Sequence, residues 1–143
     1  MHPGMHGTTF GGGPLACAVA IEFLRILDRM LGHIRQTGDY FHAKLEGLKA
    51  RHDGVREIRG MGLMLGMNLD SGERAKAVVA QLLDRGILIN RTQDTVLRFL
   101  PPYIIQKAHV DLVVRALDTA LASTQPKKHL TRDQKSKRRS QLR

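Results

Sequence analysis

The fold is decided by the stretch Val55-Arg56-Glu57-Ile58-Arg59-Gly60-Met61-Gly62-Leu63-Met64-Leu65-Gly66-Met67-Asn68-Leu69. Here the hydrophobic period stops being helical, and we interpret residues 55–59 and 63–69 as two strands or as one bent strand. Gly60, Gly62 and Gly66 then mark positions of close approach or bulging. Their spacing, Gly-x-Gly-x-x-x-Gly, is not the dinucleotide-binding fingerprint and does not lead into a helix, which excludes a Rossmann fold.

Upstream of this stretch the pattern is helical. Pro14 opens a segment, residues 14–30, that is apolar nearly all round and keeps its polar residues in one narrow stripe. Such a helix must be covered on most sides, so we expect it to pack against something besides its own chain. After Gly32 the spacing predicts a second helix that ends near residues 52–54; its shared apolar face consists of Ile34, Phe41, Leu45 and Leu48.

Downstream, a helix is predicted around residues 75–82, with Gly86 as its left-handed terminator. Two strands follow, at residues 87–90 and 95–100, and Pro101-Pro102 ends the second. A last helix covers residues 110–121, and structure is expected to fade near Ser123. This order predicts an α+β (α/β) fold, in which a small, mostly antiparallel sheet has helices on one side.

The composition fits one domain of 143 residues with an apolar core. No signal peptide or membrane-length apolar run is recognisable, so we expect a cytoplasmic protein. The single cysteine, Cys17, lies in an apolar run and is expected to pack as a small hydrophobe. Seven scattered histidines give no metal-ligand spacing, and no metal site is predicted.

The net charge of +10 is concentrated at the C-terminus. Residues 126–143 hold one acid, Asp133, and eight basic residues: Lys127, Lys128, Arg132, Lys135, Lys137, Arg138, Arg139 and Arg143. A segment so poor in apolar residues is expected to be a solvated, disordered tail. Binding of nucleic acid or an anionic partner through this tail stays open as an alternative.

One glycine-rich loop stands near the N-terminus: His6-Gly7-Thr8-Thr9-Phe10-Gly11-Gly12-Gly13-Pro14. Proline suits the first turn of a helix, and a loop that enters a helix gathers free N–H groups at the positive end of its dipole. Such a loop is suited to binding phosphate or another oxyanion. A flexible linker followed by a helix cap is the alternative that this stretch leaves open.

Arg98 is a charged residue inside the apolar strand Val96-Leu97-Arg98-Phe99-Leu100. An arginine that faces a cavity is suited to bidentate binding of a carboxylate or phosphate. An arginine that faces the surface is the alternative, and this feature alone does not separate the two.

Three segments in this order resemble the C-terminal part of class III, fold type I, pyridoxal-phosphate-dependent aminotransferases. They are the loop from His6 to Cys17, the stretch Arg56-Glu57-Ile58-Arg59-Gly60-Met61-Gly62-Leu63-Met64-Leu65-Gly66, and Val96-Leu97-Arg98-Phe99-Leu100-Pro101-Pro102. The resemblance covers roughly residues 4–122 and is strongest to the acetylornithine type, with the ornithine type close behind. It implies that the fold is the small C-terminal domain of these enzymes.

The resemblance also implies roles for particular residues. Thr9, with the backbone around Gly7 and Thr8, would hold the phosphate of pyridoxal 5'-phosphate in a neighbouring subunit, and Thr8 would lie beside the substrate. Arg98 would bind the α-carboxylate of the amino-acid substrate. Gly13 departs from the asparagine that is common there. The resemblance implies that the Schiff-base lysine belongs to an upstream domain. Independently, Lys44, Lys49, Lys76 and Lys107 fall on predicted helix surfaces or ends, where a solvated charge is expected.

We therefore expect a segment of a transaminase that moves an amino group from N-acetylornithine to 2-oxoglutarate in arginine biosynthesis. Its expected partner is a second copy in a homodimer or the N-terminal part of the enzyme. On its own the chain is expected to be inactive, with no catalytic residue of its own. Ornithine, succinylornithine, 4-aminobutyrate or a lysine derivative are alternative donors. The predicted division is a phosphate-binding loop at 1–13, a helical interface segment at 14–53, a small α+β domain at 54–123 and the basic tail at 124–143.

Overall fold

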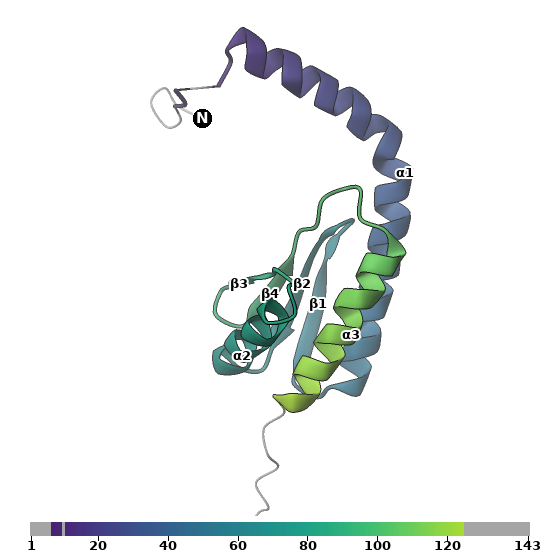
Figure 1. The fold of residues 1–143 in the computed structure, drawn as a ribbon, viewed down its shortest axis with the longest axis vertical. Helices are drawn as coiled ribbons and strands as arrows, with labels where there is room; N and C mark the ends of the chain where they lie inside the picture. Colours follow the sequence, from purple (N-terminus) through teal and green to yellow (C-terminus); the bar gives the residue numbers. More distant parts are fainter. Residues whose placement is uncertain (1–6, 10, 125–143) are drawn as a thin grey trace, which may run out of the picture.

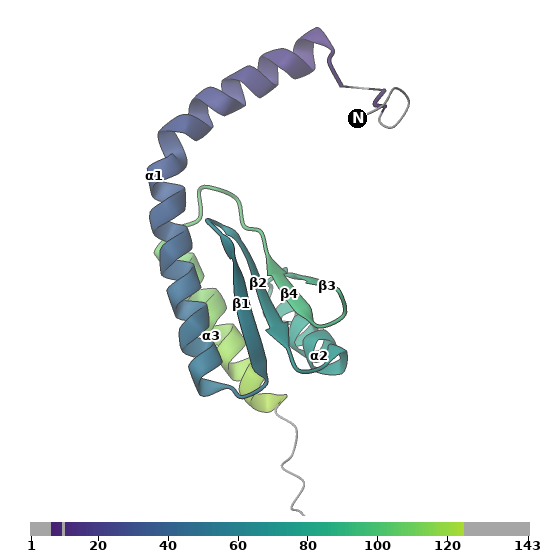
Figure 2. The same ribbon diagram turned by 180° about the vertical axis from the view of Figure 1, so that it is seen from behind.

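The computed structural model describes residues 7–9 and 11–124. The elements in this part of the chain follow in the order α1 (Pro14–Arg51), β1 (Val55–Met61), β2 (Met64–Leu69), α2 (Gly72–Leu83), β3 (Asn90–Thr92), β4 (Val96–Phe99) and α3 (Lys107–Ser123). The strands pair antiparallel in the order β1-β2-β4-β3. The helices lie on one side of this sheet (Figures 1 and 2), which confirms the predicted α+β class.

The prediction of two helices before the sheet was wrong, because α1 runs without a break through Gly32. A glycine inside a helix costs about 1 kcal/mol relative to alanine but does not by itself end the helix. Pro14 stands in the first turn, as predicted. The buried residues of α1 begin only at Ile34, so the first half of the helix projects beyond the sheet (Figure 1).

β1 and β2 form a hairpin, so the decisive stretch is two strands and not one bent strand. Gly62 in its turn has φ +55°, and Gly60 in β1, just before the turn, has φ +135°; a side chain would be strained at both. A bulge lies between Val55 and Glu57. Gly38 of α1 packs on this turn so closely that a Cβ atom at Gly38 would overlap the backbone of Gly62.

The prediction of a strand at residues 87–90 was wrong in position. After α2, Gly86 adopts φ +73°, and the Ile87 N–H donates to the Leu82 carbonyl at 2.9 Å. That N–H caps the helix and is not available to the sheet. β3 starts only at Asn90, opposite Arg98, and a turn with positive φ at Gln93 and Asp94 joins it to β4.

The core lies between the sheet and the helices. Phe41 of α1 meets Phe99 of β4 edge to face, with ring centroids 5.3 Å apart. Met67 and Leu97 lie at its centre and are fully buried, and Leu117 of α3 closes it from the helix side. No helix in the described ranges is long and apolar enough to cross a membrane.

Candidate functional site

Arg98 lies on the sheet face that carries no helix, which we call the open face. The neighbours of Arg98 in β4, Leu97 and Phe99, are buried in the core, so the alternation of the strand directs Arg98 the other way. The side chain is exposed and makes no hydrogen bond or ion pair with any residue in 7–9 or 11–124. Of the two alternatives, the surface-facing orientation is therefore the one found in this chain.

The open face holds a second arginine beside Arg98. Across the strands, Arg59 pairs with Gly66, and Gly66 pairs with Arg98, so all three lie in one row. Arg59 donates to Glu57 Oε2 at 2.8 Å and to Gln93 Oε1 at 3.3 Å. The guanidinium of Arg98 is thus free to bind a ligand, while that of Arg59 is engaged.

The N-terminal loop offers hydrogen-bond donors. Gly11 N–H donates to Thr8 Oγ1 at 3.1 Å, and Gly12 adopts φ +81°, which gives the loop a defined turn before α1. Thr8 and Thr9 are exposed, and the hydroxyl of Thr9 has no partner within the described ranges. The first turn of α1 has no acidic residue that would repel an anion. His6 and Phe10 of the same loop lie outside the described residues.

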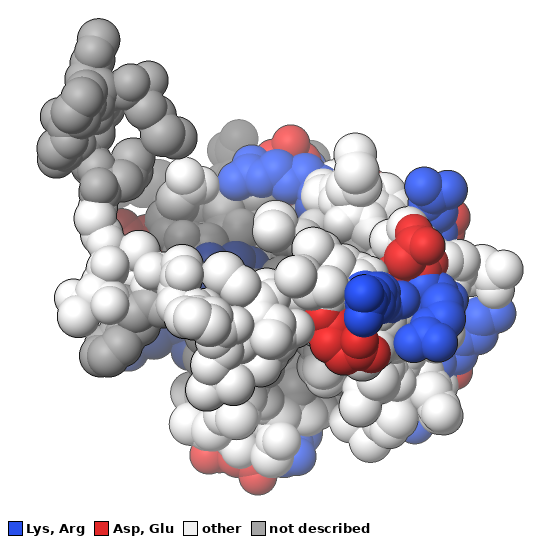
Figure 3. Space-filling view, turned by 90° about the horizontal axis from the view of Figure 1, so that it is seen from above, with Lys and Arg blue, Asp and Glu red and all other residues white. Residues whose placement is uncertain are grey.

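The loop and Arg98 do not meet within one chain. The loop stands at the free end of the projecting half of α1, far from β4 (Figures 1 and 2). Seen from above, a large part of the molecular surface is uncharged (Figure 3). The exposed large hydrophobic residues of this half of α1 are Leu15, Val19, Ile21, Phe23, Leu24, Ile26 and Leu31. Cys17, in the same region, is exposed and not packed in a core.

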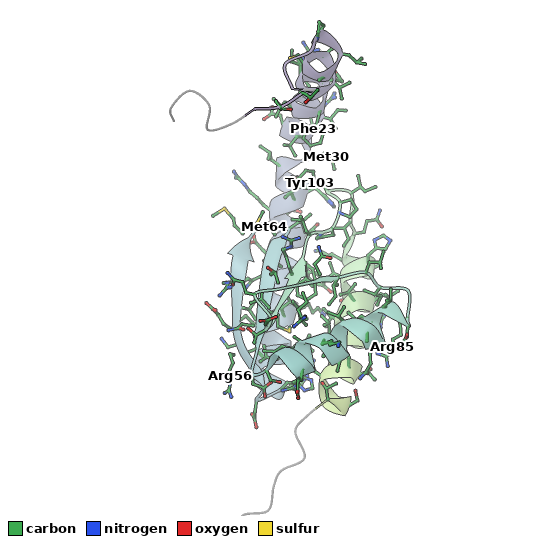
Figure 4. All side chains as sticks on the ribbon, turned by 90° about the vertical axis from the view of Figure 1, so that its left-hand side faces the viewer. Phe23, Met30, Arg56, Met64, Arg85 and Tyr103 are labelled. Atoms are coloured by element: carbon green, nitrogen blue, oxygen red, sulfur yellow. The ribbon has the colours of Figure 1, made fainter. Side chains whose placement is uncertain are left out.

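A cleft of about 520 Å³ lies where α1 passes the tip of the hairpin, and the sequence did not indicate it. Leu31 and Arg35 of α1 form one side, and Met64 and Tyr103 are among the residues opposite. Phe23 continues this edge, with its ring centroid 6.3 Å from that of Tyr103 (Figure 4). The period of α1 could not reveal a cleft that depends on how the helix crosses the hairpin.

The four described lysines do not have the environment of a Schiff-base lysine, which must be desolvated and neutral to react. Hydrogen bonding to Tyr40, and then to Asp111, raises the pKa of Lys44. A Schiff-base lysine needs a lowered pKa, so this shift is in the opposite direction. Lys49 pairs with Glu46 at 3.6 Å, and Lys107 lies over the Tyr40 ring at 5.2 Å. Lys76 is exposed on α2.

Comparison with known proteins gives consistent matches. The sequence model of the family Aminotransferase class-III matches residues 1–121. An acetylornithine aminotransferase of Methanocaldococcus jannaschii is 44% identical over 117 residues, which is 80% of this chain and 29% of that protein. Ornithine aminotransferase 2 of Staphylococcus saprophyticus is 42% identical over 114 residues, 78% of this chain and 28% of that protein.

A solved structure matches as well. The crystal structure of acetylornithine aminotransferase from Elizabethkingia anophelis superposes with a TM-score of 0.71 at 28% identity. The match covers 86% of this chain and 33% of that one. The chain therefore spans about a third of the length of the proteins that it matches.

Proposed function

This chain belongs to the class III aminotransferases, and we propose that it supplies the substrate-carboxylate and cofactor-phosphate contacts of an acetylornithine-type enzyme. The reaction would move an amino group from N-acetylornithine to 2-oxoglutarate, in arginine biosynthesis in the cytoplasm. The 44% identity to the Methanocaldococcus jannaschii protein supports the acetylornithine type. The 42% identity to a staphylococcal ornithine aminotransferase favours ornithine as the second candidate donor.

The observation that carries this proposal is that no residue in the described part of the chain binds the guanidinium of Arg98 on the open face. A guanidinium presents a planar fork of donors that matches the two oxygens of a carboxylate. Burial of Leu97 and Phe99 on either side fixes the strand beneath it. Arg98 would therefore hold the α-carboxylate of the amino-acid substrate and orient its amino group.

The N-terminal loop fits the phosphate of pyridoxal 5'-phosphate by its donor chemistry. Thr9 can donate its hydroxyl proton, and Thr8 can still donate its own while it accepts from Gly11. The backbone around Gly7 belongs to the same loop, which leads into the N-terminus of α1 at Pro14. When bound, the cofactor supplies the electron sink that makes transfer of an amino group possible. Because the loop lies far from Arg98 of its own chain, we propose that it binds the cofactor of a neighbouring subunit in a homodimer.

The environments of the described lysines support a further part of the proposal: the chain alone is inactive. Purified chain mixed with pyridoxal 5'-phosphate, N-acetylornithine and 2-oxoglutarate should form no glutamate. Glutamate formation that requires both substrates and stops after borohydride treatment would contradict this. A reactive lysine would then have to be present among its own residues.

The role of Arg98 is tested in a chimaera. Residues 1–124 replace the matching segment of the Methanocaldococcus jannaschii protein, which provides the rest of the enzyme. The chimaera should transaminate N-acetylornithine, and Arg98→Gln should lower kcat/KM about 100-fold, the size expected from two charge-assisted hydrogen bonds. Arg56→Gln, which removes a charge from the same sheet at its far end (Figure 4), serves as the control and should leave kcat/KM unchanged. Equal activity of the Arg98 variant and the parent would overturn the assignment.

The alternative of a nucleic-acid-binding protein depends on residues 126–143, which lie outside the described residues. No structural observation favours it.

A further inference from the structure

Two histidines hold the peptide group between Ile105 and Gln106, where the loop after β4 enters α3. His33 of α1 lies with its Nε2 atom 2.8 Å from the Ile105 carbonyl oxygen. On the other side of the same peptide group, the Gln106 N–H donates to His109 Nδ1 at 3.1 Å. The carbonyl and the N–H of one peptide group are therefore each bound by an imidazole, and the two imidazoles come from different helices. We call this pair of imidazoles the clamp.

The two bonds of the clamp require different protonation states. A carbonyl oxygen can only accept, so His33 must carry a proton on Nε2 and donate it. A backbone N–H can only donate, so His109 must be the neutral ring with its proton on Nε2 and a free lone pair on Nδ1. A second proton on His33 leaves its bond in place, whereas a second proton on His109 removes the acceptor. Acid therefore acts on one side of the peptide group and not on the other.

The position of His109 in α3 adds to this effect. His109 is in the first turn of the helix, and its side chain reaches back to the backbone of the N-cap residue, Gln106. The N-terminus of a helix is the positive end of its dipole, where a cation is unfavourable. A protonated His109 thus loses its hydrogen bond and also meets an unfavourable field, so both effects move it away from the N-cap.

Histidine is the residue type whose charge changes near neutral pH, and the other groups around the clamp do not share this property. The charged or titratable side chains one turn before His33, along the cleft, or within two residues of His109 are Arg29, Arg35, Asp39, Tyr103, Lys107 and Asp111. Asp111 accepts from Tyr40 at 2.6 Å, and this bond lowers the pKa of Asp111. Side chains of these types keep their charge between about pH 7.5 and about pH 5.5. The change in this range therefore falls on the two imidazoles.

We propose that His33 and His109 form a pH-sensitive clamp, which fixes the loop of residues 100–106 near neutral pH and releases its α3 side on mild acidification. This loop follows the strand that carries Arg98, and its residues Leu100 and Tyr103 line the cleft beside α1. The bond from His33 still ties the loop to α1 after His109 has let go. One wall of the cleft thus becomes looser at low pH without being detached, and this inference does not depend on the proposed function.

The clamp is tested by NMR on the full chain labelled with nitrogen-15, at about pH 7.5 and about pH 5.5, on either side of the charge change of histidine. At the higher pH, the ring-nitrogen shifts should show a proton on Nε2 of both histidines and none on Nδ1 of His109. At the lower pH, the hydrogen-exchange protection factor of the Gln106 amide should fall about fivefold, the size expected for one hydrogen bond. A proton on Nδ1 of His109 at the higher pH, or no proton on Nε2 of His33, would overturn the inference without any variant.

His109→Gln is the decisive variant, because the glutamine side-chain oxygen can still accept from the Gln106 N–H and does not titrate. The fall in protection between the two pH values should disappear in it. His42→Gln is the matched control, since it removes a histidine from α1 outside the clamp and should keep the fall. The inference fails if the fall persists in His109→Gln or is lost in His42→Gln. Circular dichroism at both pH values checks that each variant keeps its fold.

Discussion

Asp118 of α3 is the carboxylate whose surroundings link folding to pH. His52 Nε2 lies 2.6 Å from its Oδ1, and Arg51 donates to its Oδ2 at 3.2 Å. The hydrogen bond to His52, and then the charge of Arg51, lower the pKa of Asp118, although partial burial opposes this. The pair joins the end of α1 to α3, so its ionisation acts on the fold and not on the open face.

Since the pKa of Asp118 is lower in the folded chain than in the unfolded one, its contribution is complete above the unfolded value. As the pH falls, the unfolded chain takes up the proton first, and stability is lost until the folded carboxyl is protonated too. Urea unfolding from about pH 5 to pH 3 should therefore show falling stability, with a smaller slope in Asp118→Asn. The slope does not vanish, because hydrogen bonding to Tyr40 lowers the pKa of Asp111 as well. Asp53→Asn, at an exposed neighbour, is the control; equal slopes in the two variants would contradict the assignment.

At the same scale, the sequence could indicate Arg98 as a candidate because a charge inside an apolar strand is unusual. It could not decide which way the side chain points, since that depends on the register between β2 and β4. For the same reason, the sequence could not show that Arg59 lies in the same row as Arg98. Arg59 and Arg98 are seen to share a row only because both pair with Gly66. The sequence shows only the period-two alternation of the two strand segments, which lie about 40 residues apart.

At the scale of elements, α1 shows how two glycines in one helix act differently. Nothing lies within 4 Å of a Cβ atom at Gly32, whereas one at Gly38 would overlap the Gly62 backbone. The sequence pattern predicted a break at Gly32, because a glycine in a helical pattern can mark a helix end. The sequence pattern could not predict that position 38 requires a glycine, because the close contact at Gly38 is made by the hairpin turn.

These two positions give a prediction with opposite signs. Gly32→Ala should stabilise the chain by up to about 1 kcal/mol, because alanine is the better helix former and the site is open. Gly38→Ala should destabilise it by about 1–3 kcal/mol, because α1 must move away from Gly62. Chemical denaturation of both variants measures the difference, and each serves as the control of the other. Stabilisation by both substitutions would show that α1 does not pack on the hairpin turn as described.

The strand pairing could be predicted only in part. The segments at 55–59, 63–69 and 95–100 have the alternation of half-buried strands, and all three are found. Residues 87–89 are equally apolar, but the end of α2 uses the Ile87 N–H, and Ile87 and Ile89 are only partly buried against the core. Apolar content alone does not distinguish a strand from a segment that follows a helix cap.

At the scale of the whole molecule, the projecting half of α1 is the feature that the described residues leave uncovered. Val19 is 62% exposed and Leu24 is 60% exposed, and both belong to an apolar surface of the kind that marks interfaces. Neither belongs to the buried core of the sheet. We therefore expect this half of the helix to contribute to association and not to the stability of the sheet.

Val19→Glu combined with Leu24→Glu should therefore lower self-association of the full chain and leave its unfolding midpoint unchanged. Sedimentation velocity across a range of concentrations measures the first, and thermal unfolding in dilute solution measures the second. Gln36→Glu, which adds a charge at an exposed position in the half of α1 that packs on the sheet, should change neither. If the double variant still self-associates, the contact between chains lies elsewhere. This apolar surface would then no longer support the proposal that the N-terminal loop reaches a neighbouring subunit.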